Sequence, residues 1–117
     1  DLKLDSRLVA ALEQADIHTP TLIQEKAIPL ALLGKDILAR AKTGSGKTFA
    51  YLLPILHSML IDGFDEGRVL AVLIVPTKEL AKQLEECVAM LLSQCQVAVR
   101  WTNLAAVEGG AEKQRAA

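Results

Sequence analysis

A glycine-rich stretch at residues 41–48, AKTGSGKT, constrains the fold of this chain more than any other feature. It follows a short apolar segment, 36–41, that is typical of a strand, and it opens a segment with helical character from Gly46 to about Leu60. The pattern Gly, four residues, Gly-Lys and then Ser or Thr is that of a loop that binds nucleotide phosphates. Ala41 stands where that pattern has its first glycine. The stretch therefore predicts either a phosphate-binding loop or a glycine-rich turn that happens to precede a helix.

The residue types of this stretch favour a phosphate-binding loop over a chance glycine-rich turn. Gly44 and Gly46 allow the backbone to approach phosphate oxygens and to turn its N–H groups inward. The positive end of the following helix points at the same place. Lys47 would lie between the β- and γ-phosphates as a point charge, and the Thr48 hydroxyl would coordinate Mg²⁺. The sequence thus predicts a site for a nucleoside triphosphate and Mg²⁺, with Lys47 and Thr48 as the catalytic candidates.

Alternating segments along the chain predict an α/β fold. The apolar patterns indicate helices over 6–15, 21–34, 46–60 and 77–94, and strands over 36–41, 68–76 and 96–101. Ser6, Thr21 and Thr77 are placed to cap helices, and Gly34 to end one. Pro29 predicts a kink or a break in the second helix. The order strand, helix, strand, helix, strand implies a parallel sheet with helices on both faces.

Composition narrows the possible functions. The chain has 117 residues, enough for one compact domain, and its formal net charge is −1. No global basic field therefore attracts nucleic acid, so any such binding has to be local. Cys87 and Cys95 lack metal-ligand spacing and read as reduced, structural thiols of a cytosolic or nuclear protein. No apolar run approaches the length of a membrane span, and we expect no membrane partner.

Two further segments carry candidate residues. In IHTPTLIQ, residues 17–24, the amide of Gln24 can read the N6/N7 edge of an adenine, although a solvated helix residue is the commoner role. In VPTKELAKQ, residues 75–83, the helix N-terminus with Thr77 and Lys78 can bind a phosphate of a polynucleotide backbone. A plain strand-to-helix junction explains this second segment equally well. The residues alone leave both alternatives open.

Taken together, PTLIQ, AKTGSGKT and VPTKELA, in this order and near these spacings, resemble the first half of a DEAD-box RNA helicase. The phosphate loop of that family normally begins with alanine, so Ala41 supports the resemblance. The amino-acid sequence of residues 20–56 is most similar to the nucleolar branch of the family, which acts in ribosome biogenesis on the large subunit. The resemblance implies a partial RecA-like domain over 1–117, ending before the Asp-Glu-Ala-Asp segment, with a Q-motif-like segment at 16–24.

The resemblance also implies roles for particular residues. Gln24 would recognise adenine in a pocket framed by Pro20 and Thr21. The phosphates would be held by the loop residues Ala41, Lys42, Thr43, Gly44, Ser45, Gly46, Lys47 and Thr48. RNA would be bound by two sets of residues, Pro76, Thr77, Lys78 and Glu79 in the first and Gly109 and Gly110 in the second. The implied cofactors are ATP and Mg²⁺, with Thr48 as the metal ligand.

Some features depart from the family. Asp16 and Ile17 stand where Gly-Phe is usual, and residues 1–117 contain no upstream aromatic residue to stack on adenine. The Asp-Glu-Ala-Asp carboxylates, and the arginine fingers of a second RecA-like domain, also fall outside 1–117. We therefore expect that this fragment alone does not hydrolyse ATP, and that its apolar sheet edge makes it marginally stable or prone to associate.

The resemblance further implies single-stranded RNA, a second RecA-like domain of the same chain and pre-ribosomal proteins as partners. The implied location is the nucleus or nucleolus, or otherwise the cytoplasm. The alternatives are another P-loop NTPase, such as a nucleotide kinase or a small GTPase, and an RNA- or protein-binding module without turnover. His18 and His57, which lack readable carboxylate neighbours, are expected to have surface or packing roles. Trp101 can stack on a base, although a core or rim packing role is the commoner one. Glu85 is expected on a solvated helix face.

Overall fold

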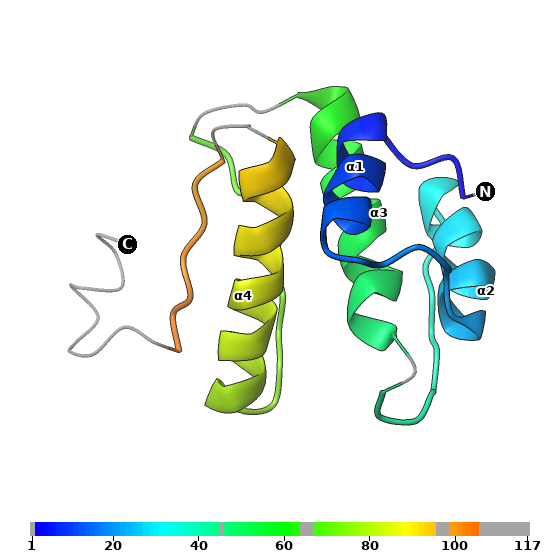
Figure 1. The fold of residues 1–117 in the computed structure, drawn as a ribbon. Helices are drawn as coiled ribbons and strands as arrows, with labels where there is room; N and C mark the ends of the chain where they lie inside the picture. The colour runs from blue at the N-terminus through cyan, green and yellow to red at the C-terminus, as the bar shows by residue number, and fades with distance from the viewer. Residues whose placement is uncertain (1, 45, 64–66, 96–98, 106–117) are drawn as a thin grey trace. The chain divides into compact units, whose positions relative to one another are not determined.

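The computed structural model describes residues 2–44, 46–63, 67–95 and 99–105, and Figure 1 shows its helices along the chain. The helices are α1 (Ser6–Gln14), α2 (Leu22–Leu32), α3 (Lys47–Asp62) and α4 (Lys78–Cys95). The chain divides into two compact units, Asp1–Ala71 with α1 to α3 and Val72–Ala117 with α4. All four helices were predicted from the sequence, with bounds that differ by no more than two residues.

The first helix is capped by Asp5, not by Ser6 as the sequence suggested. The Asp5 carboxylate accepts a hydrogen bond from the Arg7 backbone N–H at 2.9 Å and pairs with Arg7 Nε at 3.0 Å. These hydrogen bonds from Arg7, and its charge, lower the pKa of Asp5 below its ordinary value. The Asp5 N–H donates to His57 Nδ1 at 2.9 Å, and Arg7 Nη2 donates to the Leu60 carbonyl at 3.1 Å. The start of α1 is therefore anchored on α3 by hydrogen bonds, one of which the half-buried His57 accepts.

The second helix ends at a glycine, as predicted. Gly34 has φ at +80°, and its N–H bonds to the Ala31 carbonyl at 3.0 Å. The next N–H, from Lys35, reaches back to the Leu30 carbonyl at 3.1 Å, which completes a Schellman motif. Pro29 lies inside α2 without ending it, so the break that its position suggested does not occur.

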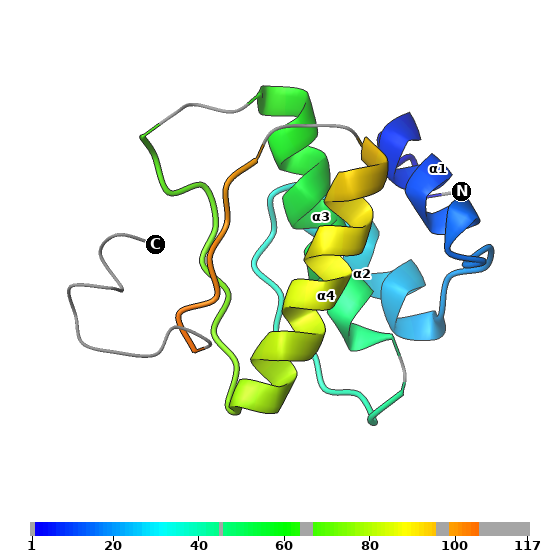
Figure 2. The same cartoon turned by 60° about the vertical axis from the view of Figure 1, so that its left-hand side comes forward.

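The core of the first unit lies between its three helices, which pack together in Figure 2. Leu8 of α1, Ile28 of α2 and Leu52 of α3 are almost fully buried. Burying one such side chain contributes roughly 1.5–3 kcal/mol to the free energy of unfolding. The remaining buried apolar residues of this unit are Ala11, Ala27, Ala50, Leu53, Pro54, Leu56 and Leu60. The position of the N-terminal end of α3 is therefore set by helix packing, mainly of α3 against α2.

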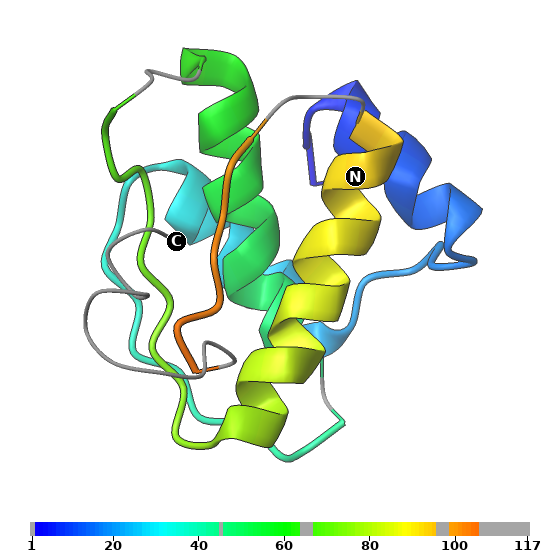
Figure 3. The same ribbon diagram turned by 90° about the vertical axis from the view of Figure 1, so that its left-hand side faces the viewer.

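The predicted parallel sheet is not confirmed. The structure assigns no strand to the described residues of 36–41, 68–76 and 96–101, which Figure 3 draws as plain tubes; residues 96–98 lie outside the description. A strand requires a neighbour whose backbone pairs with its N–H and C=O groups, and no such ladder forms among the described residues. Apolar side chains along these segments are exposed instead, with Leu38 fully and Ile74 92% accessible. The strand predicted over 68–76 is therefore not confirmed, and its apolar side chains are mostly exposed here.

Candidate nucleotide and RNA sites

The glycine-rich loop forms the turn into α3 that the sequence predicted. Gly44 and Gly46 both lie in the left-handed region, with φ at +82° and +89°, where a side chain is strained. Gly46 is the N-cap of α3, so Lys47 and Thr48 are the first two helical residues. Ser45 lies outside the described residues. The loop thus has the local geometry that brings backbone N–H groups and the Lys47 side chain to one helix end.

The end of this loop is held by a residue far away in the sequence. The Gly46 carbonyl accepts a hydrogen bond from the Ala50 N–H at 3.2 Å and a second from Gln24 Nε2 at 3.1 Å. Gln24 also accepts, through Oε1, a hydrogen bond from the Thr21 N–H at 3.0 Å. It is the one polar residue among the buried side chains of the described chain, with 5% of its surface exposed. Gln24 therefore links the first turn of α2 to the first turn of α3.

This link leaves no room for a side chain at Gly46. A Cβ atom placed there would lie 2.5 Å from Gln24 Nε2 and 2.7 Å from Thr21 Oγ1. Real Cβ atoms do not come this close to other heavy atoms, so any larger residue must displace Gln24 or Thr21. Gly44 differs, because a Cβ at that position would have no heavy atom within 4 Å. Of these two glycines, Gly46 is therefore required both by backbone conformation and by close packing.

Thr21 packs beside the loop as the N-cap of α2. It forms a capping box with Gln24, whose side chain accepts a hydrogen bond from the Thr21 N–H. Thr21 Oγ1 is buried against Gly46, so it supports the loop from the side of α2 and is closed to a ligand. Gly44 and Gly46 adopt the left-handed conformation without strain and lead into the N-terminus of α3, whose free N–H groups favour an anion. The residues present therefore suit a phosphate-bearing ligand.

The electrostatics of the loop also favour an anion. Lys47 is exposed, and no carboxylate partner for it occurs among the described side chains. The first turn of α3 contains no acidic residue. N–H groups of a first helical turn lack intrahelical acceptors, and the helix dipole adds a partial positive charge there. A phosphate group at this end would meet positive charge from the helix and from Lys47.

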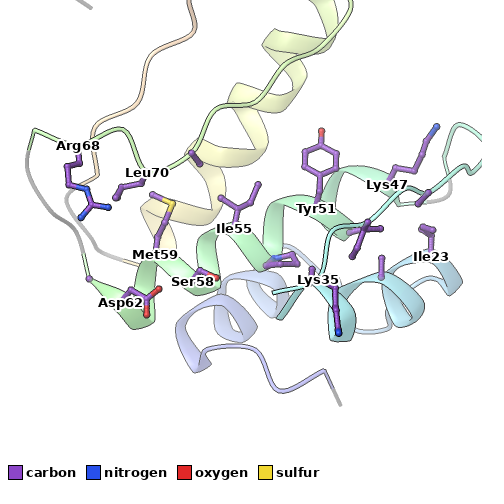
Figure 4. A pocket seen from close by; sticks show the side chains of 18 residues that line it. Ile23, Lys35, Lys47, Tyr51, Ile55, Ser58, Met59, Asp62, Arg68 and Leu70 are labelled. Atoms are coloured by element: carbon purple, nitrogen blue, oxygen red, sulfur yellow. The ribbon is translucent and has the colours of Figure 1, made fainter. Parts of the chain in front are cut away.

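A cavity of about 1130 Å³ lies next to the loop within the first unit. Figure 4 shows Lys47 at one end of it and Asp62 and Arg68 towards the other, with Tyr51 and Ile55 between them. Its lining is mostly apolar and comes from α2, α3 and the extended segments that follow each of them. Gln24 and Thr21 do not line it, and Lys47 is the one described loop residue that does. The cavity therefore adjoins the polar site without being that site.

The predicted RNA-binding segment lies in the second unit, at the start of α4. Thr77 caps this helix as expected, because Thr77 Oγ1 accepts a hydrogen bond from the Leu80 N–H at 3.1 Å. Pro76, Lys78 and Glu79 are exposed around the same helix end. Gly109 and Gly110, the other predicted RNA-binding residues, lie outside the described residues. The predicted RNA-binding segment is thus an exposed helix N-terminus that is capped by Thr77.

Three interactions were not read from the sequence. His18 Nε2 lies 2.8 Å from the carboxylate of Asp16, so the expectation that His18 lacks a carboxylate neighbour is wrong. In the second unit, Asn103 Nδ2 donates to Glu85 Oε2 at 3.1 Å, so Glu85 is more than a solvated residue of a helix face. The third interaction is the hydrogen bond from the Asp5 backbone N–H to His57 Nδ1, across 52 residues of sequence. Only the first pair has a local signal, since its members stand two residues apart.

The other candidate groups carry no site. Cys95 is buried and Cys87 is half-buried, and burial, with a smaller effect of Glu86, raises the pKa of Cys87. Among the described residues no three His, Cys, Asp or Glu side chains gather as a metal site, and no helix is long and apolar enough to cross a membrane. Trp101 is 47% exposed, so it has no core role here, and the rim role and the stacking role both remain predictions.

A family model described as DEAD/DEAH box helicase matches residues 21–116. Because this match covers most of the chain, the chain belongs to the DEAD/DEAH box helicase family, as the three motifs indicated. Membership of this family implies a RecA-like fold.

Fungal proteins named ATP-dependent RNA helicase DBP9 are similar to the chain. The protein of Coccidioides immitis is 51% identical over 106 residues, which are 88% of this chain and 17% of that protein. The protein of Botryotinia fuckeliana is 50% identical over 105 residues, 88% of this chain and 17% of that protein. The protein of Schizosaccharomyces pombe is 45% identical over 109 residues, 90% of this chain and 18% of that protein. The chain thus spans less than one fifth of the length of these relatives.

Proposed function

We propose that this chain is the ATP-binding part of an ATP-dependent RNA helicase. The observation that carries the proposal is the junction at Gly46, where a glycine in the left-handed conformation, the start of α3 with the exposed Lys47, and a buried glutamine meet. Family membership and the printed names of the relatives support it. The proposed reaction is ATP hydrolysis coupled to the remodelling of RNA.

In this proposal the loop residues 41–48 hold the phosphates of ATP. Backbone N–H groups of the loop and of the first turn of α3 donate to phosphate oxygens, and Lys47 neutralises charge at the β- and γ-phosphates. Thr48 is the proposed Mg²⁺ ligand, and the metal supplies further neutralisation of phosphate charge when bound. Each of these groups acts by position and charge, because phosphoryl transfer needs little covalent chemistry from the protein.

Gln24 is the proposed reader of adenine, beside Pro20 and Thr21. Its amide is already bonded at both ends, Oε1 to the Thr21 N–H and Nε2 to the Gly46 carbonyl. Bidentate reading of a base requires one donor and one acceptor of the same amide. Gln24 must therefore exchange its bond to Gly46 for a bond to the base, or read adenine through the remaining amide hydrogen and the second lone pair of Oε1.

RNA is the proposed ligand of the start of α4, at Pro76, Thr77, Lys78 and Glu79, with Gly109 and Gly110 as further contacts. The carboxylates needed to hold Mg²⁺ and to position water would come from an Asp-Glu-Ala-Asp segment, which residues 1–117 do not contain. Arginine fingers would come from a second RecA-like domain of the intact protein. The strands expected over 36–41, 68–76 and 96–101 would pair within the completed sheet. Pre-ribosomal particles of the nucleolus are the proposed place of action, on the resemblance of residues 20–56 to that branch.

The test is the RNA-stimulated ATPase activity of the intact protein with Lys47→Ala. We expect a loss of about 100-fold or more in kcat, the scale seen when one preorganised electrostatic group is removed from a site. Lys26→Ala removes an equally exposed lysine from α2 and is the matched control, with unchanged activity expected. ATPase activity that RNA does not stimulate would assign the protein to another class of P-loop NTPase. Absence of turnover in the unaltered protein would leave a binding module, and normal turnover in Lys47→Ala would contradict the proposed role of the loop.

A further inference from the structure

Lys47 begins a row of side chains that runs along one side of α3. Residues four apart on a helix lie on the same face, and this row continues with Tyr51, Ile55 and Met59. All four side chains line the cavity of the first unit, and Figure 4 shows them on the same side of the helix. Tyr51 therefore supplies the first large side chain after Lys47 on this face.

The ring of Tyr51 belongs over the helical turn that contains Lys47. The two residues are about 6 Å apart along the axis of α3, which brings their side chains within contact of one another. Aromatic side chains of a helix lean towards its N-terminus, so a tyrosine at position 51 covers the turn of Lys47. In Figure 4 both side chains rise from α3 in the same direction. The methylene groups of Lys47 are thus within reach of the ring.

The exposure of both side chains leaves them free to act on each other. Tyr51 is 40% exposed, whereas its neighbours Ala50 and Leu52 are buried in the helical core. Lys47 is exposed, pairs with no carboxylate of the described chain, and shares the first turn of α3 with no acidic residue. No ion pair therefore fixes the direction of the Lys47 ammonium group, and the ring of Tyr51 is the neighbouring group that can restrict it.

We propose that Tyr51 is a positioning residue for ATP binding, whose ring packs against the methylene groups of Lys47 and holds the ammonium group towards the phosphate loop. A lysine that is ordered before the ligand arrives loses less rotamer freedom on binding, so the affinity for phosphate rises. The face of an aromatic ring also attracts an ammonium group. The inference rests on the proposed function, because it needs Lys47 to bind the phosphates of ATP.

The experiment measures the affinity of the intact protein for ATP with Mg²⁺, together with kcat and the melting temperature. Tyr51→Ala is expected to weaken ATP binding by about three- to tenfold, the factor that ordering one long side chain costs. Bound phosphates then hold Lys47 in place, so kcat at saturating ATP is expected to change by less than about twofold. Tyr51→Phe keeps the ring and is expected to retain the affinity. Ile61→Ala is the matched control, since Ile61 is 62% exposed on the same helix and does not line the cavity.

A double-mutant cycle with Lys47→Ala separates positioning from a general structural role. If Tyr51 acts through Lys47, Tyr51→Ala weakens ATP binding no further once Lys47 has been replaced. A residue that only supports the fold would lower the affinity by the same factor in both backgrounds. Should Tyr51→Ala unfold below the assay temperature, Tyr51→Leu takes its place in the cycle, because leucine keeps a large apolar side chain without the ring.

Three results would overturn the inference. The first is an ATP affinity that Tyr51→Ala and Tyr51→Leu leave unchanged, and the second is an equal loss with and without Lys47. The third is a loss of affinity in Tyr51→Phe, which would assign the effect to the hydroxyl group instead of the ring. If Lys47→Ala itself binds and hydrolyses ATP as the unaltered protein does, the proposed function fails, and this result is distinct from the other three.

Discussion

Asp16 holds a backbone conformation that favours glycine, with φ at +61°. Its N–H and that of the next residue bond to carbonyls in the last turn of α1 at 3.0 and 2.9 Å. Gly34 and the residue after it end α2 by the same pair of bonds, at 3.0 and 3.1 Å. The two helices therefore stop by one mechanism, with aspartate in one case and glycine in the other. The position of Asp16 is one where the sequence departs from the usual glycine of the family, and the structure shows why glycine suits it.

At this scale we predict that Asp16→Gly raises the free energy of unfolding by about 0.5–1 kcal/mol. Relief of left-handed strain, worth roughly 1–2 kcal/mol, exceeds the greater flexibility of glycine in the unfolded chain. The lost pairing with His18 costs little, because both side chains are exposed. Urea unfolding measures the effect, and Gly34→Asp is the mirror-image control, with a loss expected. Destabilisation by Asp16→Gly would contradict the argument.

At the scale of elements, α2 and α3 are coupled at their starts. Gln24 joins the first turn of α2 to the Gly46 carbonyl, which also accepts the first intrahelical bond of α3. The two helices also make the most extensive helix contact of the first unit. A displacement of α2 is therefore expected to reach the glycine-rich loop through the hydrogen bond from Gln24 to the Gly46 carbonyl.

We predict that Gly46→Ala destabilises the intact protein more than Gly44→Ala does. Both substitutions place a side chain in the left-handed region, at roughly 1–2 kcal/mol each. Gly46→Ala additionally collides with Gln24 Nε2 and costs about another 1–3 kcal/mol through the broken hydrogen bond. Chemical denaturation of the two variants separates strain from collision. Equal losses in the free energy of unfolding for the two variants would show that the Gln24 side chain moves aside without a measurable cost.

At the scale of the whole molecule, the described residues combine packed helices with extended segments whose apolar side chains are exposed to solvent. Leu38, Val69, Val72 and Ile74 are all highly exposed along the extended segments. Monomeric proteins rarely leave such a set uncovered, because each side chain gains free energy by leaving water. The relatives are more than five times longer than the matched part, so they contain abundant chain for such a role.

We predict that residues 1–117 on their own bind a hydrophobic dye and self-associate at micromolar concentration. Analytical ultracentrifugation measures the association, and fluorescence measures the dye. The double substitution Leu38→Lys with Ile74→Lys is expected to reduce both signals, whereas two lysines at the exposed positions Glu25 and Glu86 are not. A monomeric, cooperatively melting fragment without dye binding would contradict the prediction.

The contrast between helices and strands shows what the sequence could predict. Helices follow from local signals, such as the cap at Thr77 and the glycine at Gly34, and both were found. Strand segments depend on partners far away in the chain, so their apolar pattern alone did not ensure a sheet. The link from Gln24 to Gly46 spans 22 residues, and nothing in either local pattern indicates it. The loop was therefore predictable as a motif, while its support was not.

The crowding at Gly46 has a consequence for how this protein can vary in evolution. Positions 24 and 46 share one small volume, since the Gln24 amide occupies the space that a Cβ at position 46 would need. Thr21 borders the same space, so a residue larger than glycine at 46 requires smaller side chains at both 21 and 24. The dependence runs one way, because a shorter side chain at 24 leaves glycine at 46 undisturbed. Among relatives we therefore expect residue 24 to vary where 46 stays glycine, and a larger residue at 46 to occur only with smaller residues at both 21 and 24.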